Sequence, residues 1–149
     1  MFKPIFSAAM LSASLLLTAC HTTTINTHPL QSLQLQTQRW TLTHLGTNVL
    51  PANLQVQPYL QFDAASKQIR GSDGCNRIMA SYQLSQNQLH FSQLSSTKMM
   101  CRDANMLLAS QFSEALQQVT SYRIEAHTLQ LLDRKGQVLM QLNNRQVAD

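Results

Sequence analysis

The sequence predicts an α+β domain, a strongly curved antiparallel sheet or cracked β-barrel packed on one main helix. Short segments of alternating apolar and polar residues recur between 40 and 142, separated by turn-forming residues, as is typical of antiparallel strands. One segment, 103–119, instead has its apolar residues at helical spacing. Many short strands with one helix favour a curved sheet that packs on that helix.

The first half of this region predicts three strands and then a hairpin. The strands are expected at 40–45, 59–62 and 67–70. A Gly-Ser-Asp-Gly turn at 71–74 closes the third strand. Alternation then resumes at 78–84 and 89–93, on either side of the polar turn 85–88, so these two segments are expected to pair as a hairpin.

The second half predicts the helix and the closing strands. Asp103 is expected to be the N-cap, because its carboxylate can accept a bond from an unpaired backbone N–H. One helix face then carries Leu108, Phe112, Leu116 and Val119. Strands are expected at 122–124, 129–133 and 138–142, with Gly136 in the left-handed position of the last turn.

The amino terminus resembles the signal peptide of a bacterial lipoprotein. Lys3 precedes a mostly apolar run at 5–17, which is too short to span a membrane. The Leu-Thr-Ala-Cys sequence at 17–20 resembles a lipobox, which implies cleavage before Cys20 and attachment of lipid to its sulfur. The alternative is an ordinary cleavable signal. His21 stands where an Asp would favour the inner membrane, so we expect a lipid anchor in the outer membrane, facing the periplasm.

This organisation leaves one domain of modest charge. We expect a signal peptide at 1–19, a lipidated N-terminus and flexible tether at 20–38, a folded domain at 39–143 and a C-terminal tail at 144–149. Loss of Lys3 with the signal lowers the formal net charge from +4 to +3. That small excess argues against nucleic-acid binding. We expect a monomer.

Two cysteines remain in the folded region, and an exported protein meets an oxidising compartment. If Leu84 pairs with Leu89, the hairpin register places Cys75 opposite residue 98, with Cys101 three residues further. A Cys75–Cys101 disulfide is therefore the expected arrangement. Two free buried thiols or a redox-active pair are the alternatives.

Four cations lie close to these cysteines in the sequence: Arg70, Arg77, Lys98 and Arg102. In the redox alternative, positive neighbours would lower the thiol pKa values. The four cations can also form a patch that faces lipid headgroups or an acidic partner. The simpler interpretation is a solvated rim of long side chains.

The order of motifs resembles the META domain family, which includes small bacterial lipoproteins related to the heat-shock protein HslJ. The resemblance rests on Trp-Thr-Leu-Thr at 40–43, Gly-Ser-Asp-Gly-Cys-Asn at 71–76, Thr-Lys-Met-Met-Cys at 97–101 and the helix with Phe112. The chain departs from the family at 109–111, where Ala-Ser-Gln replaces a stretch that often carries an acid. The resemblance implies a cracked antiparallel barrel with a helix and an association with heat shock, antibiotic tolerance and virulence. It implies no catalytic residues.

Nothing in the sequence indicates turnover chemistry. Ser72 lacks the Gly-x-Ser-x-Gly context of a hydrolase, and no carboxylates are paired. The histidines do not form a metal-ligand pair at helical spacing; they are His21, His28, His44, His90 and His127. We therefore expect a non-enzymatic protein without metal or cofactor that binds an envelope protein or lipid. The alternative is a lipid- or small-molecule-binding barrel with an apolar cavity lined by Leu89, Phe91, Phe112 and Leu116.

Overall fold

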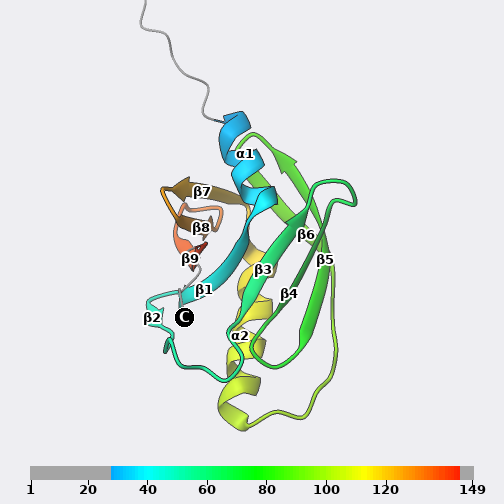
Figure 1. Ribbon diagram of the computed structural model, residues 1–149, viewed down its shortest axis with the longest axis vertical. Coiled ribbons are helices and arrows are strands. Elements are labelled where there is room, and N and C mark those ends of the chain that lie inside the picture. Colours follow the sequence, from blue (N-terminus) through cyan, green and yellow to red (C-terminus); the bar gives the residue numbers. More distant parts are fainter. Residues whose placement is uncertain (1–27, 145–149) are drawn as a thin grey trace, which may run out of the picture.

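A strongly curved antiparallel sheet of nine strands surrounds the core in the computed structural model, which describes residues 28–144 (Figure 1). The strands are β1 (Arg39–Leu45), β2 (Asn48–Val49), β3 (Tyr59–Asp63), β4 (Gln68–Ser72), β5 (Arg77–Ser85), β6 (Gln88–Ser96), β7 (Ser121–Glu125), β8 (Thr128–Leu132) and β9 (Val138–Asn143). The helices are α1 (His28–Thr37) and α2 (Asp103–Gln118). The predicted α+β class and curved antiparallel sheet are confirmed, but with two helices where the sequence predicted one main helix.

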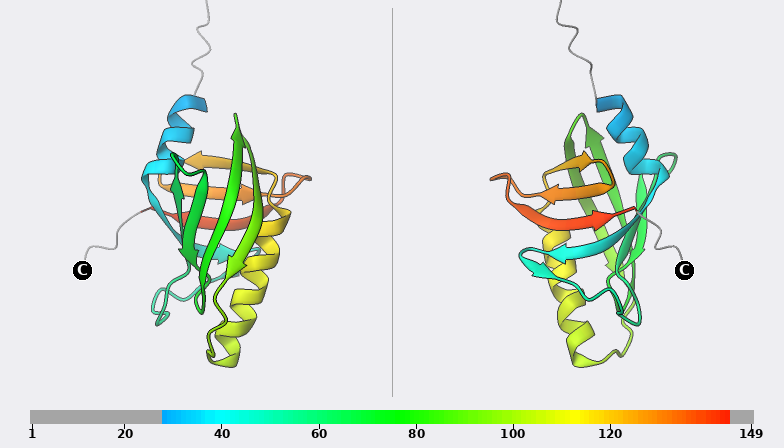
Figure 2. Two further views of the ribbon diagram at one scale, coloured as in Figure 1. Left: turned by 90° about the vertical axis from the view of Figure 1, so that its right-hand side faces the viewer. Right: turned by 60° about the vertical axis from the view of Figure 1, so that its left-hand side comes forward.

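The sheet curls into a ring because β1 pairs with both β3 and β9. Strands β7, β8 and β9 run across the direction of β3 to β6 (Figure 2). The pairing between β6 and β7 consists of the single pair Gln88 and Ser121. The ring is therefore weakest where these two strands diverge.

Helix α2 packs against β6 and β9 and lies beside the diverging strands (Figure 2). Its buried residues are Ala109, Phe112, Ala115 and Leu116. Ala109, Phe112 and Ala115 follow one another at intervals of three, and Leu116 lies four residues after Phe112, so together they form one apolar stripe that faces the sheet. The predicted helix face is confirmed for Phe112 and Leu116, which are buried in the core. The helix extends the core beyond what the ring alone encloses.

The inside of the ring is filled by side chains. The largest fully buried ones are Trp40, Tyr122, Phe112, Leu35, Leu42, Leu60, Ile69, Ile78, Leu89, Leu116, Leu129 and Leu131. Nine of these twelve residues come from strands, and the other three, Leu35, Phe112 and Leu116, come from the two helices. Strand β9 adds Met140 and Leu142 to the same core. Along most strands alternate residues point inward, which is the origin of the period of two in the sequence.

The predicted tether is wrong for residues 28–38. Residues 28–37 form α1, which packs against β3 and β7. Leu35 is completely buried, and its carbonyl oxygen accepts a hydrogen bond from Trp40 Nε1 at 3.0 Å. The folded domain thus includes α1 and does not begin at residue 39. The predicted signal peptide, Cys20 and residues 145–149 of the predicted tail lie outside the described residues.

The predicted β5–β6 hairpin is confirmed, with one change of register. Leu84 pairs with Leu89 as expected, but an irregularity between Met79 and Ser81 shifts the pairing by one residue, so that Ile78 pairs with Ser96. The predicted N-cap is wrong. Arg102 holds that position with extended backbone and no side-chain cap, and Asp103 is the first helical residue. At this first position the negative charge of Asp103 still stabilises the helix by interacting with the positive end of its dipole.

Candidate functional site

The turn between β4 and β5 is organised by the buried carboxylate of Asp73, which is 1% exposed. Its Oδ1 accepts hydrogen bonds from the backbone N–H groups of Cys75 at 2.9 Å and Asn76 at 2.5 Å, and its Oδ2 accepts one from Asn76 Nδ2 at 3.1 Å. A buried charge is tolerable only when it is satisfied in this way. Asp73 therefore fixes the conformation of the Gly-Ser-Asp-Gly-Cys-Asn sequence.

The turn requires glycine at position 74. The φ of Gly74 is +94°, and residues with a side chain adopt this backbone conformation only with strain. A Cβ at this position would also lie 3.3 Å from side-chain atoms of Leu108 and Pro58. The turn is thus closely packed against α2 and the segment that precedes β3.

The same turn positions the segment that follows β6. Asn76 Oδ1 accepts a hydrogen bond from the backbone N–H of Met99 at 2.9 Å. Arg77 donates its N–H to Thr97 Oγ1 and accepts a bond from the N–H of Thr97, each at 3.0 Å. Residues 97–99 are consequently held beside the turn although they belong to no helix or strand.

The expected disulfide is present and closes this arrangement. Cys75 and Cys101 are joined with an S–S distance of 2.06 Å and a Cα–Cα distance of 5.9 Å. The bond links the Asp73 turn to Cys101, two residues before α2, so the turn, the segment that follows β6 and the helix form one unit. Cys75 is buried and Cys101 is half-buried, and because their sulfurs are joined, the alternative of two free buried thiols does not hold in this structure.

Exposed apolar side chains gather around this disulfide. We use the name methionine face for Val56, Met79, Met99, Met100 and Met106, whose exposed fractions run from 46% for Met79 to 98% for Met100. Two hollows of about 470 Å³ and 390 Å³ lie in this face. Both are bordered by Cys75, Asn76 and Met99, so they adjoin each other across the disulfide.

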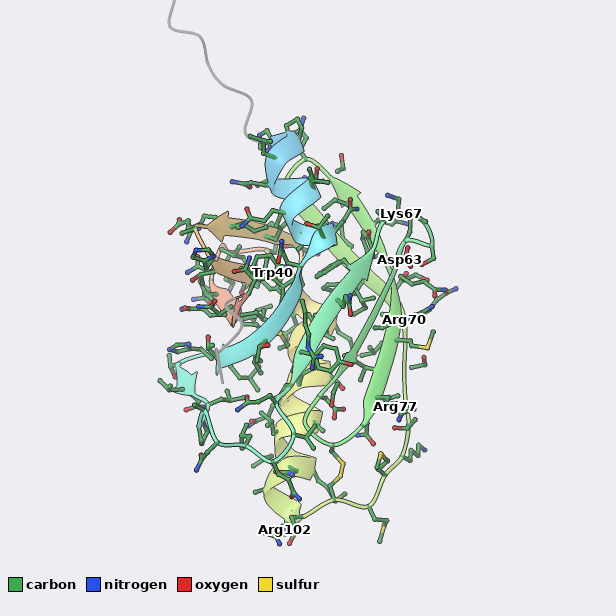
Figure 3. The ribbon with its side chains drawn as sticks, viewed as in Figure 1. Trp40, Asp63, Lys67, Arg70, Arg77 and Arg102 are labelled. Atoms are coloured by element: carbon green, nitrogen blue, oxygen red, sulfur yellow. A yellow bond between two sulfur atoms is a disulfide. The ribbon has the colours of Figure 1, made fainter. Side chains whose placement is uncertain are left out.

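Three of the four predicted cations border this face, and the four do not form a single cluster. Arg70 and Arg77 line the larger hollow and Lys98 the smaller one. Figure 3 shows Arg70 and Arg77 on the right-hand side of the domain and Arg102 at its lower end, by the start of α2. All four are exposed, and within residues 28–144 none of them makes an ion pair. Their charges remain available to a partner.

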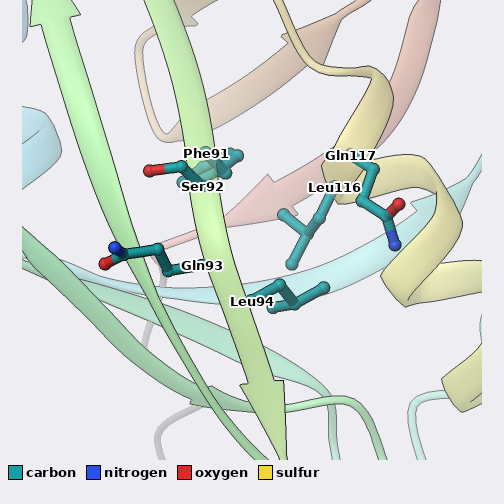
Figure 4. A pocket seen from close by; sticks show the side chains of 6 residues that line it. All are labelled: Phe91, Ser92, Gln93, Leu94, Leu116 and Gln117. Atoms are coloured by element: carbon teal, nitrogen blue, oxygen red, sulfur yellow. The ribbon is translucent and has the colours of Figure 1, made fainter.

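The alternative of a lipid- or small-molecule-binding barrel predicted an enclosed apolar cavity, and the four residues expected to line it do not enclose one. Leu89, Phe112 and Leu116 are buried in the packed core. Beside them lies an open hollow of about 290 Å³ between β6 and α2, lined by Phe91, Ser92, Gln93, Leu94, Leu116 and Gln117 (Figure 4). Of the four predicted lining residues, two border this hollow, and half of its lining residues are polar.

The groups with shifted pKa values lie away from the methionine face. Backbone N–H groups of Ser66 and Ala65 lower the pKa of Asp63 by hydrogen bonding to its carboxylate. Burial raises the pKa of Tyr82 and of Tyr122. These shifts accompany structural hydrogen bonds, since the Tyr82 hydroxyl donates to the carbonyl oxygen of Asp63 and accepts from Gln36 Nε2.

Within the described part of the chain, no group of three or more His, Cys, Asp or Glu side chains could hold a metal ion. No helix between residues 28 and 144 is long and apolar enough to cross a bilayer.

The sequence analysis missed the two main components of this site. Asp73 was interpreted as an ordinary turn residue, whereas it is the buried centre of the turn. The methionine face was not predicted because its residues come from a strand, a helix and irregular segments that are distant in the sequence, and only the tertiary fold brings them together. Met-Met at 99–100, apolar residues outside any strand or helix pattern, was the available signal.

Comparisons with known proteins agree with this architecture. One NMR structure is 26% identical with a TM-score of 0.61, over 75% of this chain and 92% of the other. An NMR structure of a protein from Burkholderia xenovorans has 20% identity and a TM-score of 0.64, over 97% and 99% of the two chains. A DUF4847 family protein from Bacteroides vulgatus is 14% identical with a TM-score of 0.59, over 79% of this chain and 99% of its own.

No curated protein matches the sequence. The META domain family matches residues 33–146, which include α1 from Leu33 onward, the Asp73 turn, the disulfide and the whole sheet. This span agrees with a domain that begins before residue 39. The chain belongs to the META domain family.

Proposed function

We propose that this protein is a non-enzymatic, lipid-anchored binding protein of the bacterial cell envelope, and that it supports tolerance of heat or antibiotic stress by binding another envelope protein. The lipobox-like sequence that ends at Cys20 supports the anchor, and the META domain supports the association with stress. The proposed location is the outer membrane, with the domain in the periplasm.

The observation that carries this proposal is the concentration of exposed apolar groups on the methionine face. Single exposed apolar residues are normal on protein surfaces, whereas a contiguous group beside concave hollows is typical of interaction sites. Methionine suits such a site because its unbranched thioether side chain adapts to partners of different shape.

The charges around the face define the chemistry of the partner. Arg70, Arg77 and Lys98 line the hollows, and the one acidic side chain that borders them, Asp73, is buried and satisfied by the turn. A complementary ligand therefore presents apolar side chains to the methionines and carboxylates to the cations. We propose an exposed protein segment of this composition as the partner.

The polar groups of the face support binding rather than catalysis. The carboxylate of Asp73 and the amide of Asn76 are both used to hold the turn and the segment beside it. Both oxygens of the Asp73 carboxylate are already hydrogen-bonded within the turn, so the carboxylate has a structural role there. The cysteines are joined in a disulfide.

Selection from a displayed peptide library tests the binding proposal. The bait is the full lipidated chain, purified in detergent and immobilised. We expect enriched peptides to combine apolar and acidic residues. Their affinity should fall about tenfold, corresponding to about 1.4 kcal/mol, in Met99→Gln/Met100→Gln. The matched variant Met99→Leu/Met100→Leu should retain the peptide affinity, because leucine keeps the surface apolar. Peptides that bind both variants equally would contradict the proposal.

The anchor has its own test. Cys20→Ser removes the sulfur that would carry the lipid, so the variant should remain unlipidated, either uncleaved or in the soluble periplasmic fraction. Intact mass and membrane fractionation report these outcomes. A Cys20→Ser protein that is still acylated and fractionates unchanged with membranes would overturn the lipobox interpretation.

A further inference from the structure

Helix α1 carries a second exposed apolar surface, at the opposite end of the domain from the disulfide. Leu30 is 66% exposed and Leu33 is 59% exposed. Residues three apart lie on the same side of a helix, so the two leucines form one outward stripe with the exposed Thr37. The inward side of the helix is occupied by Leu35, which is completely buried.

The orientation of this stripe is fixed by the contacts of α1. Trp40 Nε1 donates to the carbonyl oxygen of Leu35 at 3.0 Å, and Gln36 Nε2 donates to the Tyr82 hydroxyl at 2.8 Å. Gln34 Nε2 also donates to the carbonyl oxygen of Ala126 at 2.8 Å. Because these bonds hold the helix to three separate parts of the sheet, Leu30 and Leu33 cannot turn into the core without breaking them.

The helix is also free of charge. Its sequence, His-Pro-Leu-Gln-Ser-Leu-Gln-Leu-Gln-Thr, contains no Asp, Glu, Lys or Arg. A charged side chain on the outward stripe would have to leave water on contact with an apolar phase, at high cost. The stripe can therefore approach the interfacial region of a bilayer without an electrostatic penalty.

The length of chain before α1 brings a membrane within reach of this stripe. Eight peptide units separate Cys20 from His28, which at full extension span roughly 28 Å. If Cys20 carries the proposed lipid, α1 is the first described element after the anchor and must lie within this distance of it. Tethering at such short range makes even a weak contact well populated, because the effective concentration is high.

We propose that Leu30 and Leu33 insert into the surface of the bilayer that holds the anchor. This inference rests on the proposed lipidation of Cys20. It orients the domain with α1 on the membrane. In Figure 1, α1 lies at the top of the domain and the start of α2 at the bottom, so the methionine face points away from the lipid. The binding face is thereby directed toward partners in the periplasm.

Depth-dependent fluorescence quenching tests the contact. The full lipidated protein is reconstituted in vesicles of phosphatidylethanolamine and phosphatidylglycerol that contain a fraction of acyl chains labelled with a nitroxide quencher. Leu33→Cys is compared with Val49→Cys, each carrying the same fluorophore. Val49 is 70% exposed on β2, which lies away from α1 in both views of Figure 2. We expect quenching at residue 33 to exceed that at residue 49 at least threefold.

A second label keeps both leucines in place. With a fluorophore at Thr37→Cys, quenching should be strong in the otherwise unchanged chain and should fall to the Val49→Cys level in Leu30→Gln/Leu33→Gln. Equal quenching at residues 33 and 49 in a protein that floats with the vesicles would overturn the insertion while leaving the anchor intact. A protein that is unacylated by intact mass and does not float would overturn the anchor itself, and the insertion with it.

Discussion

The side-chain oxygen of Asn76 accepts a hydrogen bond from the backbone N–H of Met99 at 2.9 Å. This bond connects the Asp73 turn to the segment that displays two of the exposed methionines. The disulfide one residue before Asn76 makes a second, covalent connection to the same segment. Two of the motifs that carry the resemblance to the META family, at 71–76 and 97–101, therefore meet at the methionine face.

The disulfide is expected to contribute substantially to stability. It closes a loop with a sequence separation of 26 residues, and the chain-entropy account of such a loop gives roughly 3.5 kcal/mol. Cys75→Ser/Cys101→Ser should lower the free energy of unfolding by about this amount in denaturant titrations. Intact mass of the native protein should be about 2 Da below the dithiol value, because two hydrogens are lost on forming the bond. Quantitative alkylation of both thiols in freshly isolated protein would contradict the expectation.

Gly71 is expected to tolerate no side chain. A Cβ at this position would lie 2.1 Å from the backbone carbonyl oxygen of Tyr59 on the neighbouring strand, so β3 and β4 would have to separate. Gly71→Ala should destabilise the protein by about 3 kcal/mol or more. Gly136→Ala is the matched control: its position has a positive φ but open space, and strain alone should cost about 1–2 kcal/mol. Equal losses in thermal unfolding would show that the clash is relieved cheaply.

Phe112 should contribute more to stability than any exposed residue of α2. Its side chain is completely buried between the helix and the sheet, and Phe112→Ala should cost about 3–5 kcal/mol through lost burial and an unfilled cavity. For a domain of typical stability this is a large share of the total, so the variant should be depleted in cells. Gln117→Ala, on the exposed side of the helix, should change stability by less than about 0.5 kcal/mol. Equal melting temperatures for Phe112→Ala and the unchanged protein would contradict the packing of α2.

Asp63 should make the domain sensitive to acid. Its pKa is lowered in the folded protein because the backbone N–H groups of Ser66 and Ala65 donate to the ionised carboxylate. The stabilisation is complete above the unfolded pKa of about 3.9 and is lost as the pH falls through the lower folded value. NMR titration should place the Asp63 midpoint below the value of about 3.9 of an unstructured Asp. Asp63→Asn should reduce the fall in the free energy of unfolding at acidic pH. An unchanged dependence on pH would rule out the contribution of Asp63.

The sequence predicted the parts of the fold that depend on local patterns. Alternation located the β5–β6 hairpin and its pairing of Leu84 with Leu89. The shift of register between Met79 and Ser81 was not predictable, because it depends on an irregular backbone near Gln93, whose φ is positive. Helix α1 was missed because one residue, Leu35, anchors it in the core while glutamines fill much of the rest.

The sequence predicted the disulfide of the candidate site but not its exposed methionine face. Spacing and register were sufficient to join Cys75 to Cys101. The four cations were also identified, although the structure spreads them along a rim instead of gathering them in a patch. The exposure of Met99 and Met100 results from tertiary contacts of residues 97–99 with the Asp73 turn, and no local pattern encodes such contacts.

Site-specific photo-cross-linking in cells tests the central claim, that the methionine face binds an envelope protein, most directly. A photoreactive amino acid replaces Met100 in one strain and Val49 in another, and adducts are collected during heat or antibiotic stress. We predict a discrete adduct from residue 100 alone, whose cross-linked peptide carries apolar and acidic residues, and its loss in Arg70→Glu/Arg77→Glu at unchanged protein abundance. The same adducts from both positions, or an adduct that persists after the charge reversal, would contradict the account.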